Sequence, residues 1–264
     1  MVILAYSALG IVAGLLAGLF GVGGGTIIVP VLLLCLGMQG VEPTLQMHIA
    51  VGTSLASIVV TSISSAWTHH NTGAVRWWLV AWLTPGLCAG VWLGADFAAA
   101  LHGNTLQGLF GVFALVIAVQ MAAGWQPASI RDLPGRGGIV LASLLIGWVS
   151  ALFGIGGGSL TVPFLSLCRV RIQDAVATAA ACGFPIAFAG ALAYMWQGWS
   201  VAGLPAYSAG FVYVPAMLGI SLTSVPSARL GARLAHRWPA LILKRSFSAF
   251  LALIGVMFLI HSFQ

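Results

Sequence analysis

Ten apolar segments, separated by short polar stretches, run through this chain from one end to the other. Hydrophobic residues make up 60% of the sequence, and charged residues only 5%. Because a soluble domain carries about 25% charged residues, such a chain cannot cover a soluble surface. Long apolar runs with so little charge predict an all-α polytopic membrane protein. We place the segments at 3–20, 26–37, 45–67, 76–97, 104–123, 139–153, 159–168, 174–196, 203–223 and 241–261.

Three further features exclude other classes. Residues 1–20 carry no charge and therefore lack the basic start of a signal peptide, so we expect them to form the first membrane element. The net charge of +6 is not gathered on a soluble basic face, which argues against a nucleic-acid partner. Four isolated cysteines in apolar runs predict neither a disulfide framework nor a metal site: Cys35, Cys88, Cys168 and Cys182.

The sequence contains two copies of one unit. GVGGGTIIVP at 21–30 matches GIGGGSLTVP at 154–163, and AVGTS at 50–54 matches AVATA at 175–179. Farther along, LGADFA at 93–98 matches LGARLA at 230–235, and Phe110 matches Phe247. We therefore predict two repeats of five elements, at 1–123 and 139–264, joined by a polar linker at 124–138.

The positions of lysine and arginine predict the membrane topology. With five elements in each copy, all ten Lys and Arg residues fall on one side, and Glu42 and Asp96 fall on the other. With four elements in each copy, basic residues fall on both sides. Basic loops remain in the cytoplasm, so the linker should be cytoplasmic and both termini should lie outside a bacterial inner membrane. Since five is odd, the second repeat is inverted relative to the first, as in many secondary transporters.

The element after each glycine cluster is too short to cross a bilayer. A helix of about 12 residues rises about 18 Å, whereas the hydrocarbon core is about 30 Å thick. We therefore expect a re-entrant or broken-helix hairpin in each repeat, with a GxGGG[TS] tip. Thr26 and Ser159 are suitable N-cap residues, and Pro30 and Pro163 would lie in the first helical turn.

Two such helix N-termini would form an anion site near the middle of the membrane. Backbone N–H groups at a helix start carry partial positive charge and must face protein or a wet cavity rather than lipid. The alternative is that the glycines only permit close helix packing. A nucleotide-binding loop is excluded because there is no GxxxxGK[ST] motif and no preceding strand.

The chain resembles the TauE/SafE family of sulfite and organosulfonate exporters. The residues that carry the resemblance are LFGVGGGTIIVP, LFGIGGGSLTVP and GFPIAFAGALAYMWQG at 183–198, and it extends over nearly the whole chain. The resemblance implies an inner-membrane carrier for an anionic sulfur compound such as sulfite, sulfoacetate or thiosulfate. It further implies a transport site lined by Gly23, Gly24, Gly25, Gly156, Gly157 and Gly158. Ala179 stands opposite Ser54, which departs from a symmetric hydroxyl ring.

Four polar residues in the third helices of the two repeats, three in the first and one in the second, are further candidates for substrate binding. Thr53, Ser54 and Thr178 could donate hydrogen bonds to an oxyanion, and His48 lies one turn earlier on the same helix as Thr53. The alternative for the hydroxyl groups is a bond to a carbonyl group of their own helix.

Arg76 and two histidines lie toward the basic side. Arg76 begins a helix just after Gly73 and could attract the anion, although the topology rule alone explains most cytoplasmic arginines. His69 and His70 end the third helix. Because histidine titrates near neutral pH, protons are the candidate coupling ion, but an interfacial position explains both residues without such a role.

The sequence therefore predicts a secondary transporter that exports a small anion by alternating access, with no cofactor, no metal and no catalytic residue. Two alternatives remain. An intramembrane hydrolase would need a nucleophile such as Ser159 together with a base. A passive anion channel would use the same site without counterflow.

Overall fold

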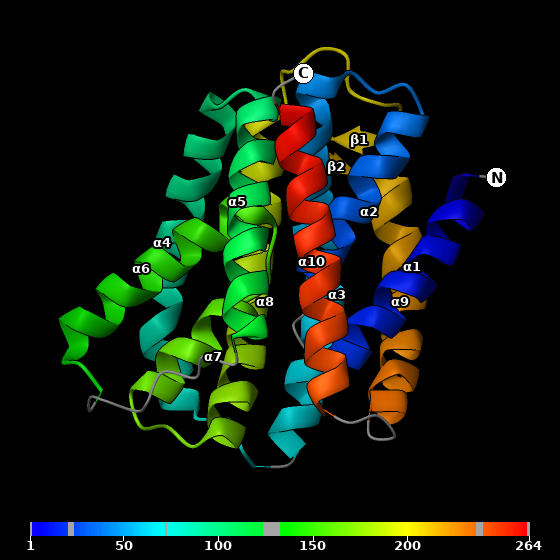
Figure 1. Cartoon of the computed structure of the whole chain (residues 1–264). Coiled ribbons are helices and arrows are strands. Elements are labelled where there is room, and N and C mark those ends of the chain that lie inside the picture. The colour runs from blue at the N-terminus through cyan, green and yellow to red at the C-terminus, as the bar shows by residue number, and fades with distance from the viewer. Residues whose placement is uncertain (1, 21–23, 72, 124–132, 236–239, 263–264) are drawn as a thin grey trace.

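The computed structural model describes residues 2–20, 24–71, 73–123, 133–235 and 240–262, and these form a bundle of helices with one small hairpin (Figure 1). The helices are α1 (Val2–Phe20), α2 (Gly25–Met38), α3 (Pro43–Asn71), α4 (Trp77–Ala100), α5 (Gly103–Ala122), α6 (Arg136–Phe153), α7 (Gly158–Leu167), α8 (Ile172–Gln197), α9 (Val214–Ala235) and α10 (Ala240–Ser262). Strands β1 (Ser208–Ala209) and β2 (Val212–Tyr213) pair antiparallel between α8 and α9.

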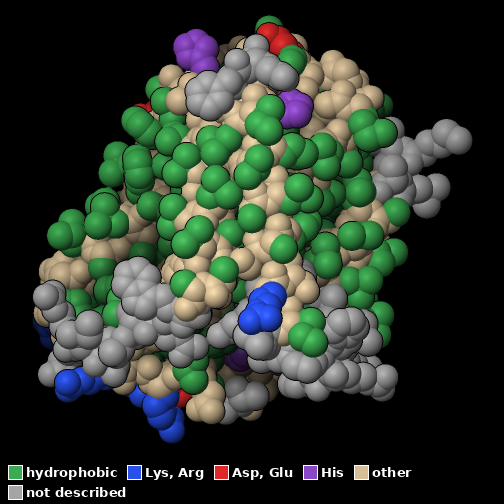
Figure 2. Space-filling model, viewed as in Figure 1, with side chains coloured by type: hydrophobic (Ala, Val, Ile, Leu, Met, Phe, Trp, Pro, Cys, Tyr) green, Lys and Arg blue, Asp and Glu red, His purple; other side chains and the backbone are tan. Residues whose placement is uncertain are grey.

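Six helices within the described residues are long and apolar enough to cross a membrane: α3, α4, α5, α6, α8 and the part of α10 from Arg245 to Ser262. Large apolar side chains also remain on the outside of the bundle, among them Leu253 and Leu222, which are 70% and 71% exposed. A continuous apolar surface of this kind suits lipid rather than water. Figure 2 shows this surface over most of the visible face. The fold is therefore that of an all-α polytopic membrane protein.

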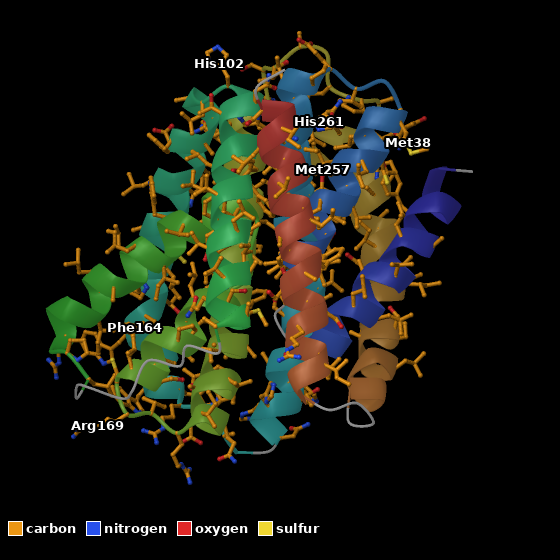
Figure 3. The ribbon with its side chains drawn as sticks, in the orientation of Figure 1. Met38, His102, Phe164, Arg169, Met257 and His261 are labelled. Atoms are coloured by element: carbon orange, nitrogen blue, oxygen red, sulfur yellow. The ribbon has the colours of Figure 1, made fainter. Side chains whose placement is uncertain are left out.

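The two ends of the bundle differ in charge. α4 and α8 begin at the lower end of Figure 1, which places Arg76 and Arg171 there, and Figure 3 labels Arg169 at the same end. We call this the basic end. Glu42 precedes α3 at the upper end, which we call the acidic end. α1 begins and α10 finishes in the upper half. The side chains of Arg131, Arg229, Arg233, Arg237 and Lys244 lie outside the described residues.

The ninth predicted segment was wrong. We expected a helix over 203–223, whereas α9 begins at Val214 because the preceding residues form the β1–β2 hairpin. Gly210 has φ +55, a left-handed conformation that suits glycine at the turn. The Phe211 amide then donates to the Tyr194 carbonyl at 3.2 Å, which holds the hairpin against the end of α8. Most of the predicted linker at 124–138 lies outside the described residues.

Small residues bring several helices into close contact. α1 packs on α9, α6 packs on α4, and the central helices α3 and α8 pack on each other. A Cβ atom at Gly90 of α4 would collide with the Leu144 carbonyl of α6, and one at Gly14 of α1 would come within 2.7 Å of the Ser224 Cα in α9. Membrane helices associate through such small surfaces because lipid removes the hydrophobic driving force between them. Phe110 and Phe247, matched in the two repeats, are both buried in the core.

Candidate functional site

The two glycine motifs meet inside the bundle. A Cβ atom at Gly25, the first residue of α2, would collide with the carbonyl oxygen of Gly154 and lie 2.9 Å from the Ile155 Cα. Only a residue without a side chain permits this contact. Gly154 has φ +62, and the Ser54 hydroxyl donates to its carbonyl at 2.9 Å, which fixes the path of the chain from α6 toward α7.

The glycines themselves, not the hydroxyl residues, cap the two short helices. Gly24 is the N-cap of α2 and Gly157 is the N-cap of α7, so the predicted caps Thr26 and Ser159 were wrong. The Gly24 carbonyl accepts from the Ile28 amide at 2.9 Å, and the Gly157 carbonyl accepts from the Thr161 amide at 2.9 Å. Each N-cap therefore lies two residues earlier than expected, and Pro30 and Pro163 lie in the second turn rather than the first. With 14 and 10 residues, both helices remain shorter than a bilayer.

A cavity of about 640 Å³ lies between these helix starts and the basic end. Gly24 and Ile28 line it from α2, and Gly158 and Ser159 line it from α7. Its wall continues to His69, in the last turn of α3, which lies at the basic end (Figure 1). A Cβ atom at Gly158 would meet no heavy atom within 4 Å, so this glycine faces open space. The two helix N-termini therefore border one space.

The polar part of the wall comes mainly from α3. Thr61, Ser65 and His69 are spaced by four residues, which places them on one helix face. Ser62 lies next to this face and donates to the Val59 carbonyl at 3.0 Å. Ser224 of α9 adds a buried hydroxyl that has no hydrogen-bond partner among the described residues.

His69 is the single ionisable side chain among the described residues that line the cavity. Among these described lining residues, no carboxylate opposes an anion. Within the described part of the chain, no group of three or more His, Cys, Asp and Glu residues could hold a metal ion.

The structure brings some predicted site residues together at the cavity and places others elsewhere. Those that line the cavity are Gly24, Gly156, Gly157, Gly158 and Ser159. Gly25 is buried in the contact between the two motifs, Thr26 is also buried, and neither lines the cavity. Gly23 lies outside the described residues.

Thr53 and Thr178 have matching structural partners instead. The Thr53 hydroxyl accepts the Tyr213 amide at 2.9 Å, just before α9, and the Thr178 hydroxyl accepts the Arg76 amide at 3.1 Å, just before α4. Each threonine thus holds the start of the fourth helix of the other half of the chain. Both side chains are fully buried away from the cavity.

His48 and Arg76 are also engaged by protein groups. The His48 ring lies between the Ala98 carbonyl at 2.9 Å and the Thr44 carbonyl at 3.3 Å, and it stacks on Phe211. The Arg76 guanidinium pairs with Asp174 at 2.8 Å. Neither residue lines the cavity. Substrate contact by these residues stays a prediction, since the contacts observed here hold the fold.

Four residues that line the cavity were not predicted from the sequence: Thr61, Ser62, Ser65 and Ser224. A signal was present for Thr61 and Ser65, because they stand eight and four residues before His69 and so share one helix face with it. Nothing in the sequence separates Ser224 from the other serines of α9, because its place in the cavity depends on the packing of α1 on α9.

The apolar bundle defines a polytopic membrane protein, and a cavity bordered by two helix starts lies inside it. The sequence profile described as "Sulfite exporter TauE/SafE" matches residues 6–258. The chain belongs to the TauE/SafE family, and the predicted resemblance is confirmed.

Similar proteins carry names that fit this membership. A "Probable membrane transporter protein" of Haemophilus influenzae is 36% identical over 95% of this chain and 96% of its own length. A protein with the same description from Methanocaldococcus jannaschii is 28% identical over 95% of this chain and 93% of its own length. The names describe membrane transport, which is not an enzymatic role. No solved structure matches the chain significantly.

Proposed function

We propose that this protein is a secondary transporter that exports a small anion of the sulfite or organosulfonate class by alternating access. The observation that carries the proposal is that the starts of α2 and α7 converge on one shared cavity. Backbone N–H groups at a helix start attract oxyanions, and two starts on one space add their partial charges. The printed family description supplies the chemical class of the anion.

The proposal includes two inverted repeats, at 1–123 and 139–264, joined by a cytoplasmic linker at 124–138. Helix contacts support this arrangement, because exchanging α1–α5 with α6–α10 turns the α1–α9 contact into the α6–α4 contact and the α2–α3 contact into α7–α8. The paired hydrogen bonds of Thr53 and Thr178 follow the same exchange. Such repeats suit a carrier whose halves rock around a central site.

The proposed orientation places the basic end in the cytoplasm of a bacterial cell and both termini outside. In this orientation the cavity faces the cytoplasm, the side from which an exporter takes its substrate. His69 is the proposed site of any proton coupling, since it is the ionisable group that lines the cavity in the described part of the chain.

Gly158→Leu tests the site directly. A side chain at this position projects into open space, so the variant should fold and insert while its leucine blocks the start of α7. We expect the affinity for sulfite or sulfoacetate to fall at least about tenfold, as expected when one or two charge-assisted hydrogen bonds are lost. Calorimetry on the purified protein measures this affinity, with thiosulfate and chloride as comparison anions.

Gly137→Leu is the matched control, because Gly137 of α6 also has no neighbouring heavy atom within 4 Å but does not line the cavity. It should bind anions normally. Normal binding by Gly158→Leu would contradict the assignment of the site. In proteoliposomes, counterflow driven by trapped anion separates a carrier from a channel, which gives none.

A further inference from the structure

An alternating-access cycle needs a second opening on the acidic side of the protein. The sequence repeat indicates which residues close that side in this structure. This inference rests on the proposed function. The alignment of AVGTS with AVATA and of Gly73 with Gly198 pairs α3 with α8 residue by residue. It pairs Ser65 with Gly190 and His69 with Tyr194. The α3 residues that line the cavity thus have counterparts in α8, and these counterparts lie toward the acidic end.

Tyr194 closes the acidic side. Its side chain is fully buried, and its hydroxyl donates to the Ala151 carbonyl at 3.0 Å. Its ring makes an edge contact with Phe211 of the hairpin, at 6.4 Å between centroids. Its counterpart His69 instead lines the cavity.

Leu55 fills the space beside Tyr194. Leu55 is fully buried, and its Cδ1 lies 2.8 Å from the position of a Cβ atom on Gly190, so α3 and α8 are in close contact here. The counterpart of Leu55 in α8 is Ala180, which lines the cavity together with Ser65. A large apolar side chain therefore packs against glycine on one side, whereas alanine and serine border empty space on the other.

We propose that Leu55 and Tyr194 form the gate through which the transported anion leaves toward the acidic end. Opening this gate separates α3 from α8, breaks the bond from Tyr194 to Ala151 and exposes Leu55 to water. Hydrating an apolar side chain is unfavourable, whereas the small and polar residues around His69 are already suited to water. The difference in composition favours the state in which the cavity faces the basic end.

Cysteine accessibility tests the gate without any substrate. Two reporters occupy matched positions, Ser62→Cys on the cavity side and Ala187→Cys on the closed side, in a protein whose four native cysteines are replaced by serine. A membrane-impermeant methanethiosulfonate should label Ser62→Cys from the basic end in membrane vesicles. It should leave Ala187→Cys, which replaces a fully buried alanine, unlabelled from the acidic end.

Tyr194→Phe and Leu55→Ala should shift the equilibrium from the state that opens to the basic end toward the state that opens to the acidic end. Each weakens the closed gate, so labelling of Ala187→Cys from the acidic end should rise at least about fivefold, and labelling of Ser62→Cys should fall. Tyr194→Phe keeps the aromatic ring, so it can still test the gate if Leu55→Ala folds poorly. Leu192→Ala, on the outer face of α8 where Leu192 is 44% exposed, is the control and should leave both rates unchanged.

The outcomes separate the gate from the transport site. Unchanged labelling in both gate variants, with normal sulfite binding by calorimetry, would overturn the gate and leave the proposed function standing. Raised labelling of Ala187→Cys with loss of the Ser62→Cys signal supports the gate whether or not sulfite is the substrate.

Discussion

The role of a hydroxyl group in this protein depends on its level along the helix that carries it. On α3, Thr53 and Ser54 point into the protein and hold the Tyr213 amide and the Gly154 carbonyl. Two turns later, Thr61 and Ser65 line the cavity. The same residue types thus fix the fold at one level and border the solute space at the next. Residue type alone therefore does not tell a hydroxyl group that holds the fold from one that lines the cavity.

Arg76 provides the prediction at this scale. Its guanidinium neutralises Asp174, whose side chain is only 7% exposed and is also contacted by Arg171. Arg76→Gln should lower the free energy of unfolding by about 1–2 kcal/mol and leave the affinity for sulfite unchanged. Thermal unfolding in detergent and calorimetry measure the two quantities.

Arg171→Gln is the matched control, because the Arg171 side chain is 75% exposed and should contribute about 0.5 kcal/mol or less. A large loss of anion affinity in Arg76→Gln, without loss of stability, would instead make Arg76 part of the binding site.

Among the elements, the short helices and the small-residue contacts carry the architecture. α2 and α7 begin inside the bundle, where the two glycine motifs approach each other at Gly25 and Gly154. α4 and α6 approach equally closely through Gly86, Gly90 and Gly94. In a membrane, helices this close are stabilised by dispersion forces between their atoms. Larger side chains at these positions would keep the helices apart.

Gly90→Leu is the prediction for this contact. A leucine at position 90 must displace the backbone of α6 at Leu144, so the free energy of unfolding should fall by about 1–3 kcal/mol. The measurement is the unfolding temperature in detergent. Equal stability of Gly90→Leu and Gly137→Leu would argue that α4 and α6 separate easily.

The whole molecule has one basic and one acidic end, and this asymmetry fixes its proposed orientation. The described arginines lie in the turns before α4 and α8, at the start of α6 and near the start of α10: Arg76, Arg169, Arg171, Arg136 and Arg245. Glu42 and Asp96 lie toward the other end. Insertion places basic turns in the cytoplasm. The cavity and the basic end then share a side, as an exporter at rest requires.

Epitope tags test the orientation. A tag after Gln264 should bind antibody on spheroplasts, in which the outer face of the inner membrane is accessible, and a tag within 124–138 should bind only after the membrane is permeabilised. The reverse pattern would place the cavity on the outer face and turn the proposed exporter into an importer.

Much of the fold could be read from periodicity and repetition. Nine of the ten apolar segments correspond to helices near their predicted limits, because an apolar run in lipid must satisfy its backbone within a helix. The ninth segment failed because the turn at Gly210 depends on contacts with the end of α8, which no local pattern encodes.

The sequence by itself determined the membrane class, the doubled unit and the importance of its glycines, since these follow from hydropathy and repetition along the chain. Only the tertiary structure decided that Gly158 and His69 border one cavity whereas Thr178 and Arg76 serve the packing. It also decided that Leu55 packs against Gly190 whereas its counterpart Ala180 borders the cavity. The physical reason is that local patterns fix which residues avoid water, whereas the contacts between distant helices fix which of them face each other.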